Sequence, residues 1–177
     1  IMNVRTENNL VKFISSFTNT KKIDITWFGG EPLLAFGRIK ALTKKIKRLS
    51  VPIDASMVTN GYLLNEEIMN SFVDLSINNI QISIDGLEEI HNFRRPHMGN
   101  GNSFKKIIKN LDLFFNLKNN VGVSLRVNID KSNTKEYHKV HELINNRYKG
   151  KNIVVYPGFV EKYNTNTCNS VSCLWDH

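Results

Sequence analysis

The chain has 177 residues, 41% of them hydrophobic and 23% charged, which is enough material for one globular domain with a substantial core. Its formal net charge of +8 is spread over many segments, which favours a solvated basic surface over a dedicated nucleic-acid site. No apolar run approaches the roughly 20 residues of a membrane span, and no signal peptide opens the sequence, so we expect a cytosolic protein without a membrane partner.

The chain repeats one unit, in which a short β-rich run is followed by a polar turn and a helical pattern. Apolar residues at helical spacing first predict an amphipathic helix over residues 9–17. The predicted strands cover residues 23–28, 53–59, 79–84, 121–129 and 153–156. The predicted helices between them cover about 33–48, a stretch beginning after Asn65, about 103–118 with Ser103 as N-cap, and about 135–147. This alternation indicates an α/β fold of parallel βαβ units.

Gly29-Gly30-Glu31-Pro32 connects the first strand to the helix after it. The paired glycines expose backbone groups and leave room for a ligand, and Pro32 suits the first position of a helix. Glu31 then stands at the carboxyl end of a strand, where α/β sheets place their ligands. The four residues fit either a corner that receives an ammonium group or a tight turn with a solvated glutamate.

Polar and apolar residues alternate along the third and fourth strands. One face carries branched apolar residues, and the other carries Gln81, Ser83 and Asp85 from the third strand and Ser124, Arg126 and Asn128 from the fourth. Small closed barrels fill their interior with branched apolar side chains, so a polar inner face predicts a wider or open sheet beside a wet cavity. The alternative is that one of these strands is a sheet edge exposed to water.

Polar motifs follow the predicted strands in a fixed order. They are Phe28-Gly29-Gly30-Glu31-Pro32, Thr59-Asn60-Gly61, Ser83-Ile84-Asp85-Gly86, the segment from His91 to Arg95, and Arg126-Val127-Asn128-Ile129-Asp130. In this order and spacing they resemble the radical S-adenosylmethionine (radical SAM) enzymes, particularly the peptide- and sulfatase-maturing branch with a cysteine-rich C-terminal SPASM domain. The resemblance covers about residues 5–160. It implies a partial (β/α)₆ TIM-like barrel over residues 1–160, with the cofactor across the carboxyl ends of its strands.

The resemblance also implies roles for single residues. Glu31, with Gly29 and Gly30, would receive the ammonium group of S-adenosylmethionine, and Ser83 with Arg95 would bind its carboxylate and polar groups, in agreement with their chemistry. The further positions implied are Thr59 and Asn60 at the same site, and Arg126 and Asn128 as ribose or substrate contacts. Some alternatives stay open: Arg94 in place of Arg95, a surface pair between Arg95 and Glu88, a Ser83 that bonds only its neighbours, and an Asn60-Gly61 pair that only forms a turn.

Family members hold a reducing [4Fe–4S] cluster with three cysteines spaced Cys-x-x-x-Cys-x-x-Cys, and this sequence has no such motif. We therefore expect a chain without the first strand and cluster loop, inactive alone, whose full protein adds that N-terminal segment and a C-terminal domain. The polar tail, residues 161–177, is expected to be irregular. Its Cys168 and Cys173 are either ligands of an auxiliary cluster or spare thiols.

In its intact form the protein is thus expected to be a radical SAM oxidoreductase. It would cleave S-adenosylmethionine to a 5′-deoxyadenosyl radical and modify a peptide or protein, as a peptide maturase does. Two other hypotheses remain from the residues alone. One is a barrel hydrolase that uses Glu31 and Asp85 as paired carboxylates, and the other is a non-catalytic barrel that binds S-adenosylmethionine or a peptide.

The resemblance makes one prediction that needs only the gene. A Cys-x-x-x-Cys-x-x-Cys motif should be encoded within roughly 50 residues upstream of Ile1, the span of one strand, its loop and a helix. Sequencing of the upstream coding region checks this, and an upstream region without cysteines would contradict the radical SAM hypothesis.

Overall fold

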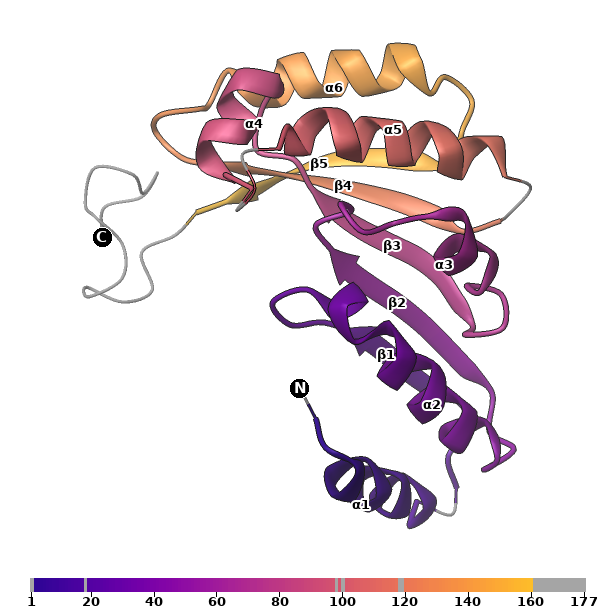
Figure 1. Cartoon of the computed structure of the whole chain (residues 1–177). Coiled ribbons are helices and arrows are strands. Elements are labelled where there is room, and N and C mark those ends of the chain that lie inside the picture. The colour runs from indigo at the N-terminus through magenta and orange to yellow at the C-terminus, as the bar shows by residue number, and fades with distance from the viewer. Residues whose placement is uncertain (1, 18, 98, 100, 118–119, 161–177) are drawn as a thin grey trace.

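A five-stranded parallel sheet forms the centre of the computed structural model, which describes residues 2–17, 19–97, 99, 101–117 and 120–160 (Figure 1). The strands lie in sequence order and each pairs only with its chain neighbours: β1 (Ile23–Trp27), β2 (Ile53–Thr59), β3 (Ile77–Ser83), β4 (Gly122–Ile129) and β5 (Ile153–Phe159). This order is that of successive βα units along a barrel wall. The predicted α/β fold, a partial TIM-like barrel of parallel strands, is confirmed.

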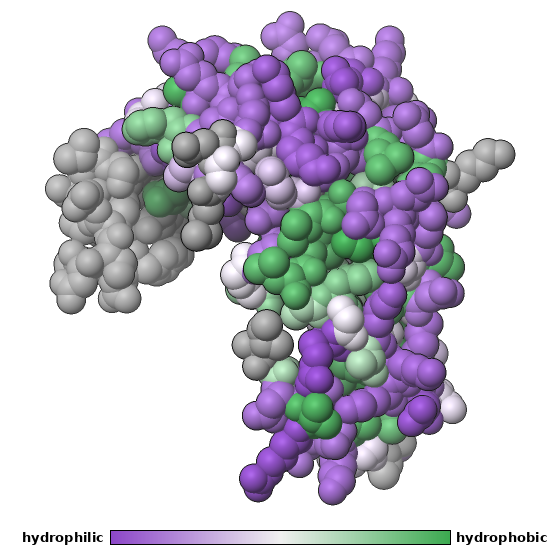
Figure 2. Space-filling view, in the orientation of Figure 1, coloured by the Kyte–Doolittle hydropathy of each residue, from purple (hydrophilic) through white to green (hydrophobic). Residues whose placement is uncertain are grey.

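Helices cover the outer side of the sheet (Figure 1). Their bounds are α1 (Val4–Ser15), the 3₁₀ helix η1 (Pro32–Ala35), α2 (Phe36–Lys47), α3 (Glu66–Asn70), α4 (Glu88–Arg94), α5 (Ser103–Asn116) and α6 (Glu136–Arg147). Within the described part of the chain, none of them is long and apolar enough to cross a membrane. Figure 2 shows a mostly polar surface, with hydrophobic residues gathered in one region of the face that it presents.

Three of the differences from the sequence prediction have a local reason. Helix α1 starts at Val4 because the Asn3 side chain caps it by accepting a hydrogen bond from the Thr6 N–H. The cap of α5 is Asn102 and not Ser103, because the Asn102 side chain accepts from the Lys105 N–H. Helix α4 was not predicted as a helix at all, since its seven residues are too few for an apolar repeat to show.

The alternation along β3 and β4 separates the core from a polar inner face. Ile80, Ile82 and Leu125 are fully buried on the helix side, whereas Ser83 and Arg126 on the opposite side are only half-buried. Because β3 pairs with β2 and β4, and β4 pairs with β3 and β5, neither strand is a sheet edge. The polar inner face is therefore confirmed, and the edge-strand alternative is wrong.

Candidate functional site

Glu31 closes the carboxyl end of β1 and is tied to the end of β2. Its Oε1 accepts hydrogen bonds from the Leu33 N–H at 3.0 Å and from the Thr59 hydroxyl at 2.7 Å. Its Oε2 accepts the Asn60 N–H at 2.8 Å. A carboxylate offers about four acceptor positions, so three are used by fixed donors and one position on Oε2 remains. The result is an anionic acceptor held in one place with capacity for one more donor.

The two glycines before Glu31 leave its approach open. Gly29 and Gly30 are exposed, and a Cβ built on either would meet no heavy atom within 4 Å. Both glycines line, together with Glu31, a hollow of about 480 Å³. The backbone groups of this turn are thus accessible to a ligand, as the sequence predicted.

Asp85 joins four segments at the carboxyl end of β3. Its buried carboxylate accepts from Arg95 Nε at 2.8 Å and from Asn128 Nδ2 at 3.0 Å. Its backbone carbonyl accepts from Asn133 Nδ2 at 2.8 Å, and its backbone N–H donates to His91 Nδ1 at 3.3 Å. Asp85 therefore fixes β3, α4, β4 and the loop after β4 relative to one another.

Arg95 takes Asp85 as its partner and not Glu88. Glu88 instead pairs with Lys105 at 3.0 Å, and Arg94 pairs with Asp130 at 2.7 Å. Only Nε of Arg95 is used by Asp85, and within the described residues its two terminal nitrogens make no hydrogen bond. Those terminal nitrogens remain available to an anionic group.

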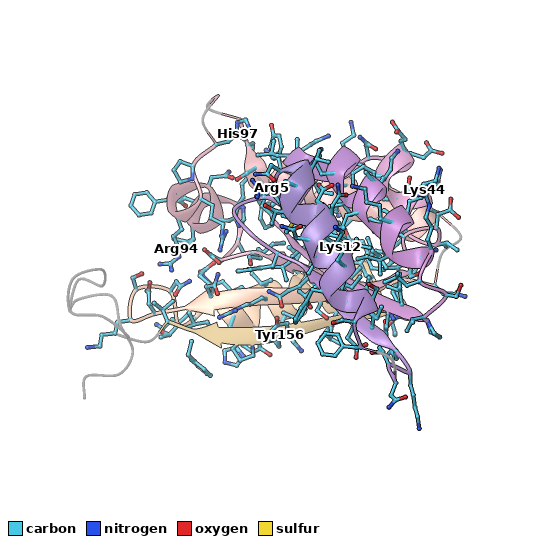
Figure 3. All side chains as sticks on the ribbon, turned by 90° about the horizontal axis from the view of Figure 1, so that it is seen from below. Arg5, Lys12, Lys44, Arg94, His97 and Tyr156 are labelled. Carbon is cyan, nitrogen blue, oxygen red and sulfur yellow. The ribbon has the colours of Figure 1, made fainter. Side chains whose placement is uncertain are left out.

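A cavity of about 530 Å³ has both Glu31 and Arg95 in its lining. It is lined by Glu31, Leu34, Asn60, Tyr62, Leu63, His91, Arg95, Pro96, His97, Ser103 and Ile107. The rings of Tyr62 and His97 stack with their centroids 4.2 Å apart. Figure 3 shows His97 and Arg94 in the region of α4. With the Glu31 carboxylate and the Arg95 guanidinium in its lining, this cavity complements the two charges of an amino-acid zwitterion.

The other predicted residues divide into three groups. Asn60 lines the cavity, and the Thr59 hydroxyl donates a hydrogen bond to Glu31. Asn128 donates a hydrogen bond to Asp85, and Ser83 lies on the inner face opposite Arg126 in the β3–β4 register. Neither residue lines this cavity. Cys168 and Cys173 lie outside the described residues.

His91 is a cavity residue that sequence reasoning did not select. Its ring is fully buried, and its Nδ1 accepts the Asp85 N–H, which places the ring proton on Nε2. Burial lowers the pKa of His91 to about 4, with Asp85 opposing this effect and Arg95 adding to it. Arg95 directly follows α4 and lies four residues after His91. This spacing was the sequence signal that could have identified His91.

The geometry argues against the hydrolase hypothesis. Asp85 is buried under Arg95 and Asn128, and Glu31 accepts from three fixed donors. A glycosidase pair needs one carboxyl group free to deliver a proton, whereas both of these serve as acceptors that hold the fold.

A family model, that of the Radical SAM superfamily, matches residues 2–161. Among curated proteins, a serine-type anaerobic sulfatase-maturating enzyme from Bacteroides thetaiotaomicron is 34% identical over 120 residues, which is 62% of this chain and 28% of that protein. A cysteine-type anaerobic sulfatase-maturating enzyme from Clostridium perfringens is 33% identical over 90 residues, which is 49% of this chain and 24% of that protein.

Solved structures show the same fold. Native anSMEcpe with bound AdoMet superposes with a TM-score of 0.79 at 22% identity, covering 97% of this chain and 47% of that one. Native anSMEcpe with bound AdoMet and the Kp18Cys peptide gives a TM-score of 0.78 at 22% identity, with the same coverage. The chain thus spans about half the length of these structures, and its matches span about a quarter of the curated relatives.

The buried His91 predicts a pH dependence of stability. The folded state keeps the ring neutral down to about pH 4, whereas the unfolded chain binds a proton near pH 6.5. The free energy of unfolding should therefore fall as the pH drops from about 6.5 to about 4, by at most about 3 kcal/mol. Urea unfolding across this pH range measures the effect in the wild-type protein and in His91→Asn. The variant keeps an acceptor for the Asp85 N–H but cannot titrate. Equal slopes for both proteins would contradict the assignment.

Asp85→Asn should destabilise the fold because it leaves the Arg95 guanidinium facing a neutral amide. We expect a loss of about 2–4 kcal/mol in the free energy of unfolding. Chemical denaturation measures this, with Asp24→Asn as the matched control, since Asp24 forms an exposed ion pair with Lys22. A similar small loss for both variants would show that Asp85 does not organise the site.

Proposed function

The chain belongs to the radical SAM superfamily, and we propose that the protein carrying it is an enzyme that uses S-adenosylmethionine to modify a peptide or protein. The observation that supports this most directly is the single cavity that contains both Glu31 and Arg95. Its volume lies within the range of small-molecule sites, roughly 300–1,000 Å³.

The methionine part of S-adenosylmethionine fits the charges of this cavity. Its ammonium group would donate to the remaining acceptor position on Oε2 of Glu31. Backbone carbonyls of the Gly29-Gly30 turn would be further acceptors, from the second hollow that Glu31 also lines. Its carboxylate would accept from the terminal nitrogens of Arg95, whose orientation Asp85 holds through Nε. Charge-assisted hydrogen bonds of this kind are about twice as strong as neutral ones, so they would fix the cofactor's orientation.

When bound beside a reduced [4Fe–4S] cluster, S-adenosylmethionine supplies the 5′-deoxyadenosyl radical of this family. The described residues contain no group of three His, Cys, Asp or Glu side chains that could hold a metal, so they do not fit the cluster. We propose that a cysteine-bearing N-terminal segment of the full protein supplies its ligands. Residues 1–160 would then be the cofactor-holding barrel, and residues 161–177 with Cys168 and Cys173 would begin an auxiliary-cluster region and C-terminal domain.

A peptide or protein substrate is supported by the relatives, which are by name enzymes that maturate sulfatases. We therefore propose a peptide maturase. The half-buried polar face formed by β3 and β4 is a hydrophilic surface on the inner side of the sheet, and such a surface suits a polar peptide better than an apolar ligand.

Loss of the Glu31 charge should weaken cofactor binding without affecting the nucleoside part. We expect Glu31→Gln to raise the dissociation constant of S-adenosylmethionine about tenfold or more, because one charge-assisted hydrogen bond is lost. Binding of 5′-methylthioadenosine, which has neither ammonium nor carboxylate, should not change. Titration calorimetry of both ligands measures this.

Glu89→Gln is the matched control, because Glu89 is exposed on α4 and outside the cavity. It should leave both affinities unchanged. An unchanged S-adenosylmethionine affinity in Glu31→Gln would refute the proposed ammonium site.

A further inference from the structure

Arg126 is a cation on the polar inner face, level with the carboxyl end of β3. It stands on β4, opposite Ser83 of β3 on one side and opposite Tyr156 of β5 on the other. The side chain is half-buried, and its Nε is buried without a hydrogen-bond partner in the described part of the chain. Tyr156 is labelled on β5 in Figure 3.

No described acidic side chain neutralises Arg126. At this end of the inner face, the Asp85 carboxylate is used by Arg95 and Asn128. At the opposite end, Asp24 and Asp54 pair with Lys22. A partly buried cation without an anion raises the free energy of the fold, unless a ligand supplies the negative charge.

Gly158 of β5 makes room for this guanidinium. A Cβ at position 158 would overlap Nε of Arg126 and would lie 2.9 Å from its Cζ. Gly158 is buried, and it is not among the glycines with positive φ, so the position uses the missing side chain and not an unusual backbone conformation. The Arg126 side chain therefore lies in a notch that only glycine provides.

The groups beside Arg126 suit a carboxylate. Both register partners carry hydroxyl groups, which can donate hydrogen bonds. Burial raises the pKa of Tyr156, against the opposing effect of Arg126, so the phenol keeps its proton. A guanidinium matches the geometry of a carboxylate, and the flanking hydroxyl groups can donate further hydrogen bonds to it.

Arg126 lies apart from the two charges that match the cofactor. It is not among the residues that line the cavity of Glu31 and Arg95. The single carboxylate of S-adenosylmethionine is matched there by Arg95. A second anionic group would then come from a second ligand, which under the proposed function is the substrate.

We propose that Arg126 is the carboxylate-binding group of a substrate site on the inner face of the sheet, and that the site takes a peptide with an acidic side chain or a free C-terminus. This rests on the proposed peptide-modifying function. It adds to that function a substrate class and the residue that selects it.

Three synthetic pentapeptides test the proposal. The first is acetylated and amidated Gly-Gly-Glu-Gly-Gly, the second has glutamine in place of glutamate, and the third is the glutamine peptide with a free C-terminal carboxylate. Dissociation constants come from amide chemical shifts of the isotope-labelled protein. We expect a carboxylate peptide to bind about tenfold tighter or more than the neutral one. Whichever carboxylate peptide binds tighter identifies the source of the anion.

Two variants change the Arg126 site in different ways. Arg126→Met removes the guanidinium, and Gly158→Ala displaces it while keeping the charge. Both variants should lower the affinity for the carboxylate peptide to that for the neutral one. The double variant should lose no more affinity than either single variant. Arg5→Met is the matched control, because it removes one charge from exposed α1 and should change nothing.

The proposal is overturned if Arg126→Met weakens the binding of neither carboxylate peptide. It is also overturned if Arg126→Met weakens the binding of S-adenosylmethionine but not that of 5′-methylthioadenosine, because Arg126 would then be part of the cofactor site. Failure of the wild-type protein to bind S-adenosylmethionine at all would instead contradict the proposed function, so the two failures are distinguishable.

Discussion

The buried carboxylate of Asp85 is the interaction on which the site depends. It accepts from Arg95 and Asn128, while its backbone binds His91 and Asn133. Parallel strands end at the same edge of a sheet, but nothing in a βαβ unit by itself fixes the loops that follow. One buried anion that needs several donors provides that restraint, since leaving any donor or acceptor unpaired in the interior would cost free energy.

Glu31 is an acidic residue at another strand end, and it serves a different purpose. It too accepts from fixed donors, in Leu33, Thr59 and Asn60, but it lines an open cavity and keeps one acceptor position. Asp85 is buried and holds Arg95 in place. The two carboxylates therefore differ in their surroundings: Glu31 keeps an acceptor position open beside the cavity, and Asp85 orients the guanidinium of Arg95. This arrangement fits an amino-acid zwitterion better than it fits the paired acids of a hydrolase.

Much of this site could be read from the sequence, because it rests on local chemistry. The Gly-Gly-Glu-Pro turn predicted an accessible acceptor, and the alternation along β3 and β4 predicted the polar inner face. The partner of Arg95 was not predictable, because Glu88 is near in sequence whereas Asp85 comes near only when α4 packs over the end of β3. The notch at Gly158 was hidden for the same reason, since it depends on the register between β4 and β5.

The sequence by itself determined the order of strands and helices, the face that each strand buries, and the residue types offered at each strand end. These follow from hydrophobic periodicity and from the backbone preferences of glycine and proline, which act over a few residues. The tertiary structure alone decided which charged groups became partners and which stayed free for ligands. Pairing depends on distances and burial between segments far apart in the chain. Packing brings Arg95 to the Asp85 carboxylate, whereas no acidic side chain in the described part of the chain pairs with Arg126.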